Sequence, residues 1–396
     1  METQTKTRQV VVIGAGPAGV ASALALKDAG LRPLVLDQAD SIGSSWRGRY
    51  DRLRLNTCRW TSHLPDRPFP KGTPLFPTRD QLVEHLETHA RESGIDLQLG
   101  TRVETLEPDG DWVMNTSAGE VRAPQVVVAT GYEGVPFVPS WSRSDSFTGL
   151  LLHASKYKNP TPFRDQRVLV VGPGCTGMEI AYDLAEGGAK KIWLSARTPP
   201  NILLKQGPGP LPGDLIGAAL LPLPPRVGDA IARFGRRMDV GDLSKYGLPV
   251  PEEGVFARLR RLGVAPAIVD KETIEAIKDG RIEIVRGVES LDADGAQLAD
   301  GAHVEPDVII CATGYRRGLE PLVGHLGVLD ESGLPRARGE RAAASGLRFI
   351  GYVPRPGGLG YAGKEAKRAA KAIASELRSP RARSLASRSK PVTAAP

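Results

Sequence analysis

The sequence predicts an α/β protein with two Rossmann-like dinucleotide-binding domains, the second of which is inserted into the first. Three observations predict this fold class. A glycine-rich turn between a strand and a helix occurs twice, at residues 14–19 and 172–177. Each unit is followed later by a buried strand that ends in Ala-Thr-Gly. A last strand and helix, at residues 347–350 and 360–377, have the character of closing elements of the first unit. With 396 residues, the chain is long enough for two or three domains.

The first glycine-rich turn lies in a complete strand–turn–helix–strand unit. Residues 9–13 are a β-branched run, an alanine-rich helix extends to about residue 29, and residues 33–36 form a second apolar strand. A glycine pattern alone is weak evidence, and it is this context that indicates a dinucleotide site.

The three glycines of this turn have separate tasks. Gly14 permits the tight turn, Gly16 lets the backbone approach a pyrophosphate, and Gly19 lets helix and strand pack closely. The helix N-terminus then directs unpaired N–H groups at the phosphates. Asp37, at the end of the next strand, can accept hydrogen bonds from ribose hydroxyls. The alternative is a glycine turn that binds no nucleotide.

The second unit repeats this arrangement with one difference. Residues 168–171 lead into GPGCTG, a helix is expected to about residue 186, and residues 191–194 form the next strand. At the position of the acid this copy has Ser195, Ala196 and Arg197. A guanidinium there can bind a 2′-phosphate through two hydrogen bonds, although a solvated surface charge is the alternative. The first site is therefore predicted to hold FAD, and the second NADPH rather than NADH.

The order of these elements sets the predicted domains. Residues 1–160 and 316–378 form a discontinuous FAD-binding domain, and residues 161–315 form the NADPH-binding domain between them. Residues 379–396 have the composition of a disordered basic tail.

Composition and charge narrow the class of protein. The net charge of +7 suits an enzyme that binds polyanionic cofactors, and no basic stripe interleaved with aromatic residues indicates nucleic-acid binding. Three scattered cysteines without a CxxC pair fit a reducing compartment. The sequence shows no signal peptide and no unbroken apolar run of spanning length, so we expect a cytoplasmic protein without a membrane span. No metal site is predicted, and no signal indicates the oligomeric state.

The segment between the two units carries a family signature. FTGLLLHASKY, residues 147–157, fits the pattern F-x-G-x-x-x-H-x-x-x-Y of class B flavin monooxygenases. GDLSKYGLPVPEEG, residues 241–254, further resembles the plant YUCCA branch and its bacterial relatives. The first motif ends in Tyr157 and Lys158, which is similar to the N-hydroxylating and YUCCA-like branches rather than to Baeyer–Villiger enzymes. The resemblance extends to about residue 377.

This resemblance implies a monooxygenase that uses FAD, NADPH and O2. NADPH would reduce the flavin, and O2 would add to it to form a C4a-(hydro)peroxyflavin that oxygenates a small apolar or aromatic substrate. The sequence leaves open whether the peroxide attacks a carbonyl, as in oxidative decarboxylation of a 2-oxo acid, or oxygenates nitrogen or sulfur. Two alternatives share the architecture: an NADPH-dependent flavin disulfide reductase, and a Baeyer–Villiger monooxygenase.

The resemblance also places residues at the reaction centre. Asn56 matches an asparagine beside the isoalloxazine ring, where its amide could hold a hydroperoxide; satisfying a buried loop is the alternative. His153 joins the catalytic set as a residue that positions NADP between the domains, and not as a proton-transfer base. Trp46 lies in a turn that would face the flavin, although a core role is equally compatible. The backbone of Val103 would meet the adenine.

The predicted cofactor-binding residues form two groups. Those assigned to FAD are Gly14, Ala15, Gly16, Pro17, Ala18, Gly19, Asp37, Gln38, Trp46, Arg47, Asn56, Thr57, Val103, Ala129, Thr130 and Gly131. Those assigned to NADPH are Gly172, Gly174, Cys175, Thr176, Gly177, Ser195, Arg197, Ala312, Thr313 and Gly314.

Residues 199–225 are expected to line the substrate chamber. This stretch is rich in proline and glycine and lacks helical or strand periodicity, which is typical of a lid or a binding loop. Its apolar residues favour an apolar or aromatic substrate. Membrane contact through Leu220, Leu221 and Leu223 is the alternative.

Overall fold

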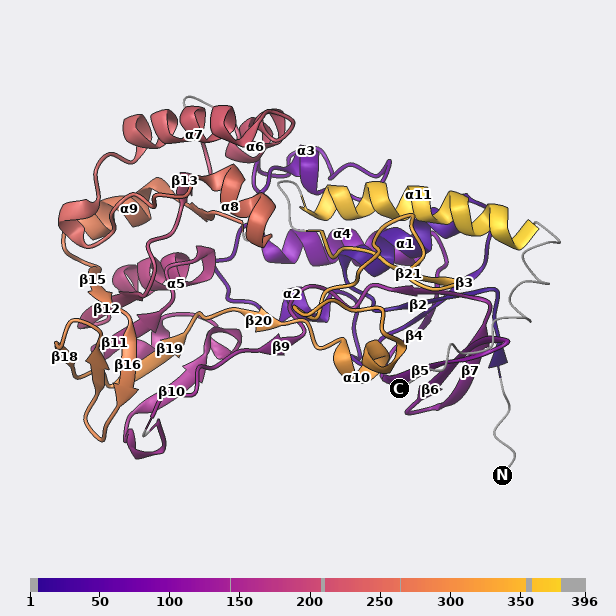
Figure 1. Ribbon diagram of the computed structural model, residues 1–396, viewed down its shortest axis with the longest axis horizontal. Coiled ribbons are helices and arrows are strands. Elements are labelled where there is room, and N and C mark those ends of the chain that lie inside the picture. The colour runs from indigo at the N-terminus through magenta and orange to yellow at the C-terminus, as the bar shows by residue number, and fades with distance from the viewer. Residues whose placement is uncertain (1–5, 143, 208–210, 264, 354–357, 379–396) are drawn as a thin grey trace, which may run out of the picture.

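The protein has two lobes, and the chain passes from the first lobe to the second and back again at their junction (Figure 1). The computed structural model describes residues 6–142, 144–207, 211–263, 265–353 and 358–378. The first lobe contains both the beginning and the end of the described chain, drawn in indigo and yellow, and the second contains its middle part, drawn in magenta to orange. The predicted basic tail, residues 379–396, lies outside the described residues.

The first lobe is built on a five-stranded parallel sheet of order β21-β8-β2-β3-β4. Because helices and further strands cover its faces, four of these strands are buried along their whole length, as is usual for a parallel sheet. The strands are β2 (Val10–Ile13), β3 (Pro33–Leu36), β4 (Asp96–Gln98), β8 (Gln125–Val128) and β21 (Leu347–Phe349).

Two layers enclose this sheet. One apolar cluster joins it to α1 (Pro17–Asp28), α4 (Arg79–Glu92) and α11 (Gly358–Arg378), and α11 packs along α1 (Figure 1). The other cluster joins it to a sheet that contains β5 (Val103–Asp109), β6 (Asp111–Thr116) and β7 (Gly119–Ala123), with β1 (Lys6–Thr7) at its edge. The remaining helices of this lobe are α2 (Ser44–Arg47), α3 (Arg59–Ser62) and α10 (Glu320–Val323).

The second lobe repeats the plan with a parallel sheet of order β10-β19-β11-β12-β15. Its strands are β10 (Leu150–His153), β11 (Arg167–Val171), β12 (Lys191–Ala196), β15 (Glu283–Arg286) and β19 (Val308–Cys311). Further elements are α5 (Cys175–Glu186), α6 (Gly213–Leu220), α7 (Pro225–Asp239), α8 (Val255–Leu262), α9 (Lys271–Lys278), the pair β13 (Ile202–Leu204) and β14 (Ala267–Val269), and the antiparallel sheet of β16 (Val288–Leu291), β17 (Ala296–Leu298) and β18 (His303–Val304).

The two connections between the lobes pair with each other. β9 (Val135–Pro136) leaves the first lobe and β20 (Tyr315–Arg316) returns from the second, and they form a short antiparallel ladder between the lobes (Figure 1). The short 3-10 helices are η1 (Ser144–Ser146), η2 (Ala154–Lys156), η3 (Thr161–Phe163), η4 (Ser244–Tyr246) and η5 (Gly324–Leu326).

The predicted domain boundary at residue 160 does not follow the sheets. β10 lies before this boundary, yet all four of its residues pair with β19 in the second sheet. It takes the edge place that β21 takes in the first sheet, beside the strand that ends in Ala-Thr-Gly. A short strand carries no signal for the sheet that it joins, because that choice depends on pairing with residues far away in the sequence.

The prediction of a loop over residues 199–225 is wrong. The described part of this stretch contains β13 and the apolar helix α6, and α7 begins at Pro225. The prolines bound these helices instead of interrupting them: Pro212 precedes the first residue of α6 and Pro225 is the first residue of α7. Proline is tolerated at both positions because the first N–H groups of a helix have no partner within it.

None of the helices in the described ranges is both long enough and apolar enough to span a bilayer. The same ranges contain no cluster of three or more His, Cys, Asp or Glu side chains that could hold a metal ion.

His85 on α4 is buried as a neutral group in the first lobe. Its ring stacks on Phe69 with centroids 4.3 Å apart, and its Nε2 faces the amide N–H of Leu64 at 3.5 Å as an acceptor. Burial lowers the pKa of His85 from 6.5 to about 4. The folded protein therefore excludes a proton that the unfolded chain binds more readily.

We predict that stability falls as the pH drops from about 6.5 to about 4, because the unfolded chain takes up this proton first. The loss attributable to His85 is on the order of 3 kcal/mol. Urea unfolding across this pH range should show a flatter pH dependence for His85→Gln than for the wild type. Equal slopes for wild type and His85→Gln would contradict the prediction.

Candidate active site

The first glycine of each turn is required by the backbone. Gly14 and Gly172 have φ values of +109° and +111°, in the region that side chains disfavour. A Cβ on Gly14 would lie 2.5 Å from the carbonyl oxygen of Ala129, and one on Gly172 would lie 2.6 Å from that of Ala312. Each Ala-Thr-Gly turn therefore presses on the glycine turn of its own lobe, which explains why the two signatures occur together.

The third glycine of each turn lets the helix pack closely against the backbone of the first glycine. A Cβ on Gly19 would collide with the carbonyl oxygen of Gly14, and one on Gly177 with that of Gly172. The N-termini of α1 and α5 are thus held directly at the ends of β2 and β11.

The middle glycine has no such role in the protein. A Cβ on Gly16 or on Gly174 would meet no atom within 4 Å. Both are N-cap residues with extended backbone, and neither α1 nor α5 has a capping side chain or an acidic residue in its first turn. The free N–H groups and the open space above these glycines fit a bound pyrophosphate.

Asp37 lies at the first turn, as predicted. Its carboxylate accepts a hydrogen bond from the N–H of Ala15 at 2.5 Å and another from that of Ala39 at 2.8 Å. Each oxygen keeps lone pairs for a ribose hydroxyl. Gln38 beside it is exposed.

Ser195 and Arg197 at the second turn have different surroundings. The hydroxyl of Ser195 is buried and donates to the carbonyl of Arg286 at 2.8 Å, so this side chain binds β12 to β15. Arg197 is exposed, and the described residues offer its guanidinium no hydrogen bond or ion pair. Its stem passes Gly287, where a Cβ would lie 3.0 Å away.

The segment 147–157 is a structural connector between the lobes. A Cβ on Gly149 would collide with the ring of Phe147 and the carbonyl of Asp307. The hydroxyl of Tyr157, which is 1% exposed, donates to Asp183 on α5 at 2.7 Å. The residues that define this motif thus hold β10 and the following turn against the rest of the second lobe.

His153 is satisfied on both ring nitrogens. Its Nε2 lies 3.0 Å from the carbonyl of Gly314 and must donate to it, and its Nδ1 accepts from the N–H of Ser155 at 3.1 Å. Burial lowers the pKa of His153. This pattern describes a neutral, fixed imidazole, which suits a positioning role better than proton transfer.

Arg49 continues this connection into the first lobe. Its guanidinium donates to the hydroxyl of Tyr315 at 2.7 Å and pairs with Glu133. The ring of Tyr315 in turn packs edge-on against His153, with centroids 4.9 Å apart. Through Glu133 and Tyr315, Arg49 therefore connects the segments that follow the two Ala-Thr-Gly turns.

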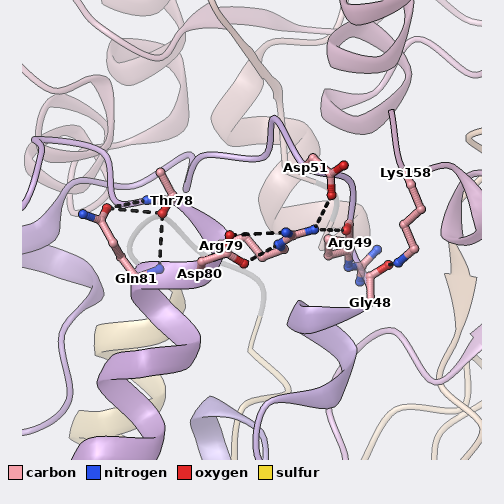
Figure 2. A network of polar contacts seen from close by, with 8 residues as sticks. All are labelled: Gly48, Arg49, Asp51, Thr78, Arg79, Asp80, Gln81 and Lys158. Atoms are coloured by element: carbon pink, nitrogen blue, oxygen red, sulfur yellow. Dashed lines mark hydrogen bonds and ion pairs between the residues drawn. The ribbon is translucent and has the colours of Figure 1, made fainter. Parts of the chain in front are cut away.

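A polar network fixes the backbone around Arg49 (Figure 2). Arg79, at the start of α4, donates to the carbonyl of Arg49 and to Asp51, and Lys158 donates to the carbonyl of Gly48. The N–H of Asp51 donates to the carbonyl of Lys158 at 2.8 Å. A capping box between Thr78 and Gln81 sets the first turn of α4 from which Arg79 projects.

A buried charged cluster lies next to this segment. The hydroxyl of Tyr50 donates to Glu179 on α5, and the ammonium of Lys205 lies 3.4 Å from Glu179 and 3.2 Å from Asp270. Tyr50, Glu179 and Lys205 are each less than a tenth exposed. Burial raises the pKa of Glu179, while Lys205 acts in the opposite direction. The cluster ties the helix of the second glycine turn to the first lobe.

Sequence reasoning missed Arg49, Tyr50, Glu179 and Lys205. Tyr50 and Glu179 are 129 residues apart in the chain, so no local spacing connects them. The only available signal was ionisable residues within apolar surroundings, such as Lys205 directly after the apolar run 202–204.

Asn56 has an unsatisfied buried atom. Its Oδ1 is buried without a hydrogen-bond partner in the described structure. Native proteins rarely leave such an atom unpaired, so a bound group at this place fits the amide. The hydroxyl of the next residue, Thr57, forms a hydrogen bond with the hydroxyl of Ser62, with the two oxygens 2.6 Å apart.

The other predicted residues lie around the same two turns. Trp46 is half-buried against the core of the first lobe, and Arg47 pairs with Glu87 on α4 at 2.5 Å. Val103 is the first residue of β5. Pro17, Ala18, Cys175 and Thr176 occupy the first turns of α1 and α5.

The Ala-Thr-Gly turns have their own tethers. The hydroxyl of Thr130 lies 2.8 Å from that of Tyr352, and Thr313 donates to the carbonyl of Phe137. Gly131 and Gly314 follow with φ values of +94° and +82°.

Comparison with known proteins identifies the family. The model of the pyridine nucleotide-disulphide oxidoreductase family matches residues 11–201. Indole-3-pyruvate monooxygenase YUCCA1 of Oryza sativa subsp. japonica is 34% identical over 319 residues, which cover 77% of this chain and 76% of that protein. Indole-3-pyruvate monooxygenase YUCCA8 of Oryza sativa subsp. indica is 33% identical over 92% of this chain and 90% of its own length. This chain belongs to the class B flavin-dependent monooxygenases. The family predicted from its motifs is confirmed.

The fold of the family is also present in solved structures. The flavin-containing monooxygenase from Stenotrophomonas maltophilia superposes with a TM-score of 0.72 at 21% identity, over 94% of this chain and all of that one. The predicted fold class, an α/β protein with two Rossmann-like domains, is confirmed. As a member of this family, the chain is an NADPH- and O2-dependent flavoprotein monooxygenase that acts on a small molecule.

The glycines allow a test that separates binding from folding. We predict that Gly16→Ala folds normally but lowers flavin affinity about tenfold or more, because the new methyl group enters the space open to the phosphates. Gly19→Ala should instead lower stability by about 3 kcal/mol, because its methyl group collides with the backbone of Gly14. Flavin titration and thermal unfolding measure the two effects.

The second turn supplies the matched pair. Gly174→Ala should raise the KM for NADPH and leave flavin content unchanged, and Gly177→Ala should destabilise the fold. Gly235→Ala, at another open position on α7, should do neither. Normal flavin and NADPH binding by both Gly16→Ala and Gly174→Ala would contradict this account of the turns.

Proposed function

We propose that the first glycine turn binds FAD and the second binds NADPH, and that the enzyme oxygenates a small aromatic 2-oxo acid. The main support is the matched pair of open glycines, Gly16 and Gly174, each at the bare N-terminus of a helix. Two such sites in one chain fit two dinucleotides, and the residues that follow them differ in charge. Asp37 would accept from the ribose of FAD, and Arg197 would bind the 2′-phosphate of NADPH.

The residues between the two sites would keep the cofactors in register. FAD, when bound, supplies the redox chemistry between NADPH and O2. His153, Arg49 and the cluster around Glu179 fix the second turn relative to the first, and hydride transfer depends steeply on such positioning. The unpaired Oδ1 of Asn56 would face the flavin, where the amide can both donate and accept a hydrogen bond.

The proposed substrate class follows from the relatives that are named indole-3-pyruvate monooxygenases. For a 2-oxo acid the balance is that substrate, O2, NADPH and a proton give a carboxylic acid shortened by one carbon, CO2, NADP+ and water. Helix α6 supports an aromatic substrate because it is apolar and is held next to α3, which follows Asn56 in the chain. The contact is a hydrogen bond from the hydroxyl of Thr61 on α3 to the carboxylate of Asp214 at the start of α6.

A disulfide reductase is disfavoured by the cysteines. Cys58, Cys175 and Cys311 are free thiols. Burial raises the pKa of Cys175 to about 11 and that of Cys311 to about 12, so neither forms a thiolate readily. The free thiols also support the proposed cytoplasmic location.

We predict that Arg197→Ala weakens NADPH binding about tenfold to a hundredfold and leaves NADH binding nearly unchanged, because only NADPH has the additional phosphate. Steady-state KM values for both cofactors measure this. Arg164→Ala, an exposed arginine before the opposite end of β11, is the control. Equal loss of both cofactors would refute the assignment of Arg197.

The function itself is tested by product mass under ¹⁸O2. Incubation with NADPH and indole-3-pyruvate should give an acid that lacks one carbon and two oxygens of the substrate, which leave as CO2, and that carries one ¹⁸O atom. A tertiary amine and a thioether are offered in parallel. Incorporation of oxygen only into the amine or thioether would overturn the proposed substrate class, and no incorporation into any of them would overturn the proposed function.

Asn56→Ala serves in the same assay as the variant at the proposed reaction centre. It should keep its flavin but divert NADPH consumption from product to hydrogen peroxide, since the bound oxygen would lose a hydrogen-bond partner. Asn115→Ala, at an exposed asparagine on β6 outside the predicted cofactor-binding residues, is the control. Unchanged coupling in Asn56→Ala would refute the role of this amide.

A further inference from the structure

Helix α7 exposes large apolar side chains on one face. Val227, Ile231, Phe234 and Met238 are 46%, 45%, 69% and 71% exposed. With 3.6 residues per turn, these four positions fall within an arc of about 60° on the helix surface. We call them the apolar stripe. In Figure 1 α7 lies at the outer edge of the second lobe, so the stripe is on the outside of the molecule.

A row of arginines lies beside this stripe. Arg226, Arg233 and Arg237 fall within an arc of about 40° next to it, and all three are exposed. In the described part of the chain no hydrogen bond or ion pair involves their guanidinium groups. The outward half of α7 therefore combines exposed apolar surface with uncompensated positive charge.

The inward face of α7 shows that this orientation is fixed. Gly228 packs against the ring of Phe256, where a Cβ would lie 2.8 Å from the ring. The carboxylate of Asp229 accepts from the N–H groups of Phe256 and Ala257 at 2.7 and 3.3 Å, at the N-terminus of α8. Turning the apolar stripe inward would break this cap. The stripe is therefore a surface feature, and the acidic residues Asp229 and Asp239 lie on the inward half of the helix.

We infer that α7 binds the surface of a lipid bilayer that contains anionic headgroups. The helix would lie in the plane of the interface, with the apolar stripe in the acyl boundary and the arginines at the phosphates. Charge argues against a second copy of this chain as the occupant, because a symmetric contact would bring the arginine rows together without an acidic partner on either outward face. Large exposed apolar surface beside polar residues is typical of interaction sites.

The position of α7 relates the proposed lipid-binding surface to the segment that contains Asn56. α6 lies between α7 and α3 in Figure 1, and Asp214 of α6 accepts from Thr61 of α3. Helix α6 thus links the helix that carries the stripe to α3, which follows Asn56 in the chain. Since no described helix can cross a bilayer, this binding would be peripheral and reversible.

The test is flotation of the flavin-loaded full chain with vesicles. Wild type should float with vesicles of phosphatidylcholine and phosphatidylglycerol in equal parts, and bind pure phosphatidylcholine at least about tenfold more weakly. The double variant Phe234→Ser, Met238→Ser should lose binding about tenfold or more. Arg233→Gln, Arg237→Gln should lose a similar factor, and high salt should abolish the preference for the anionic lipid.

Matched controls use exposed residues elsewhere. Leu150→Ser on β10, where Leu150 is 53% exposed, and Arg32→Gln, Arg102→Gln should bind as the wild type does. Flavin content and melting temperature show that every variant is folded. Binding that is equal on both lipids, or that survives the α7 substitutions, would overturn the inference. So would a dimer in solution, measured by light scattering, that dissociates in Phe234→Ser, Met238→Ser.

Discussion

The close approach of a helix to the turn before it is the contact on which the structure depends. Gly19 and Gly177 allow α1 and α5 to rest on the backbone of Gly14 and Gly172, where any side chain would collide. This contact brings the free N–H groups of each helix to the end of its strand. Because the Ala-Thr-Gly turns pack closely against Gly14 and Gly172 as well, the strand, the turn and the helix pack together as one unit in each lobe.

Two such units are useful for electron transfer only if their relative position is fixed. The protein achieves this with contacts that cross between the lobes at several levels. Within the second lobe, His153 at the end of β10 bonds to Gly314 and packs against Tyr315, which lies on the connection that returns to the first lobe. The backbone 48–51 is held by Arg79 and Lys158, which directs Arg49 to Tyr315 and Tyr50 to Glu179 (Figure 2). Buried charges make the last contact specific, since an unpaired partner would be costly to leave in the interior.

Much of the fold could be predicted because its signals are local. The sequence predicts the strand–turn–helix runs around Gly14 and Gly172 to within a few residues, and likewise β8, β19, β21 and α11. The errors arose where context decided the outcome. In residues 199–225, proline would interrupt a helix in its middle but is tolerated at its start, where Pro212 and Pro225 lie, and local sequence does not distinguish the two cases. The four residues of β10 do not encode the strand with which they pair, so the sequence does not predict that β10 joins the second sheet.

The sequence by itself determined the family, the two glycine turns and the difference between Asp37 and Arg197, because each of these depends on residues close together in the chain. Only the tertiary structure decided which residues of the motif 147–157 hold the second lobe together and that Glu179 contacts Tyr50 and Lys205. It also decided that α7 directs its apolar side chains outward. These features depend on which distant segments lie side by side, and burial and unpaired atoms exist only once those segments have packed.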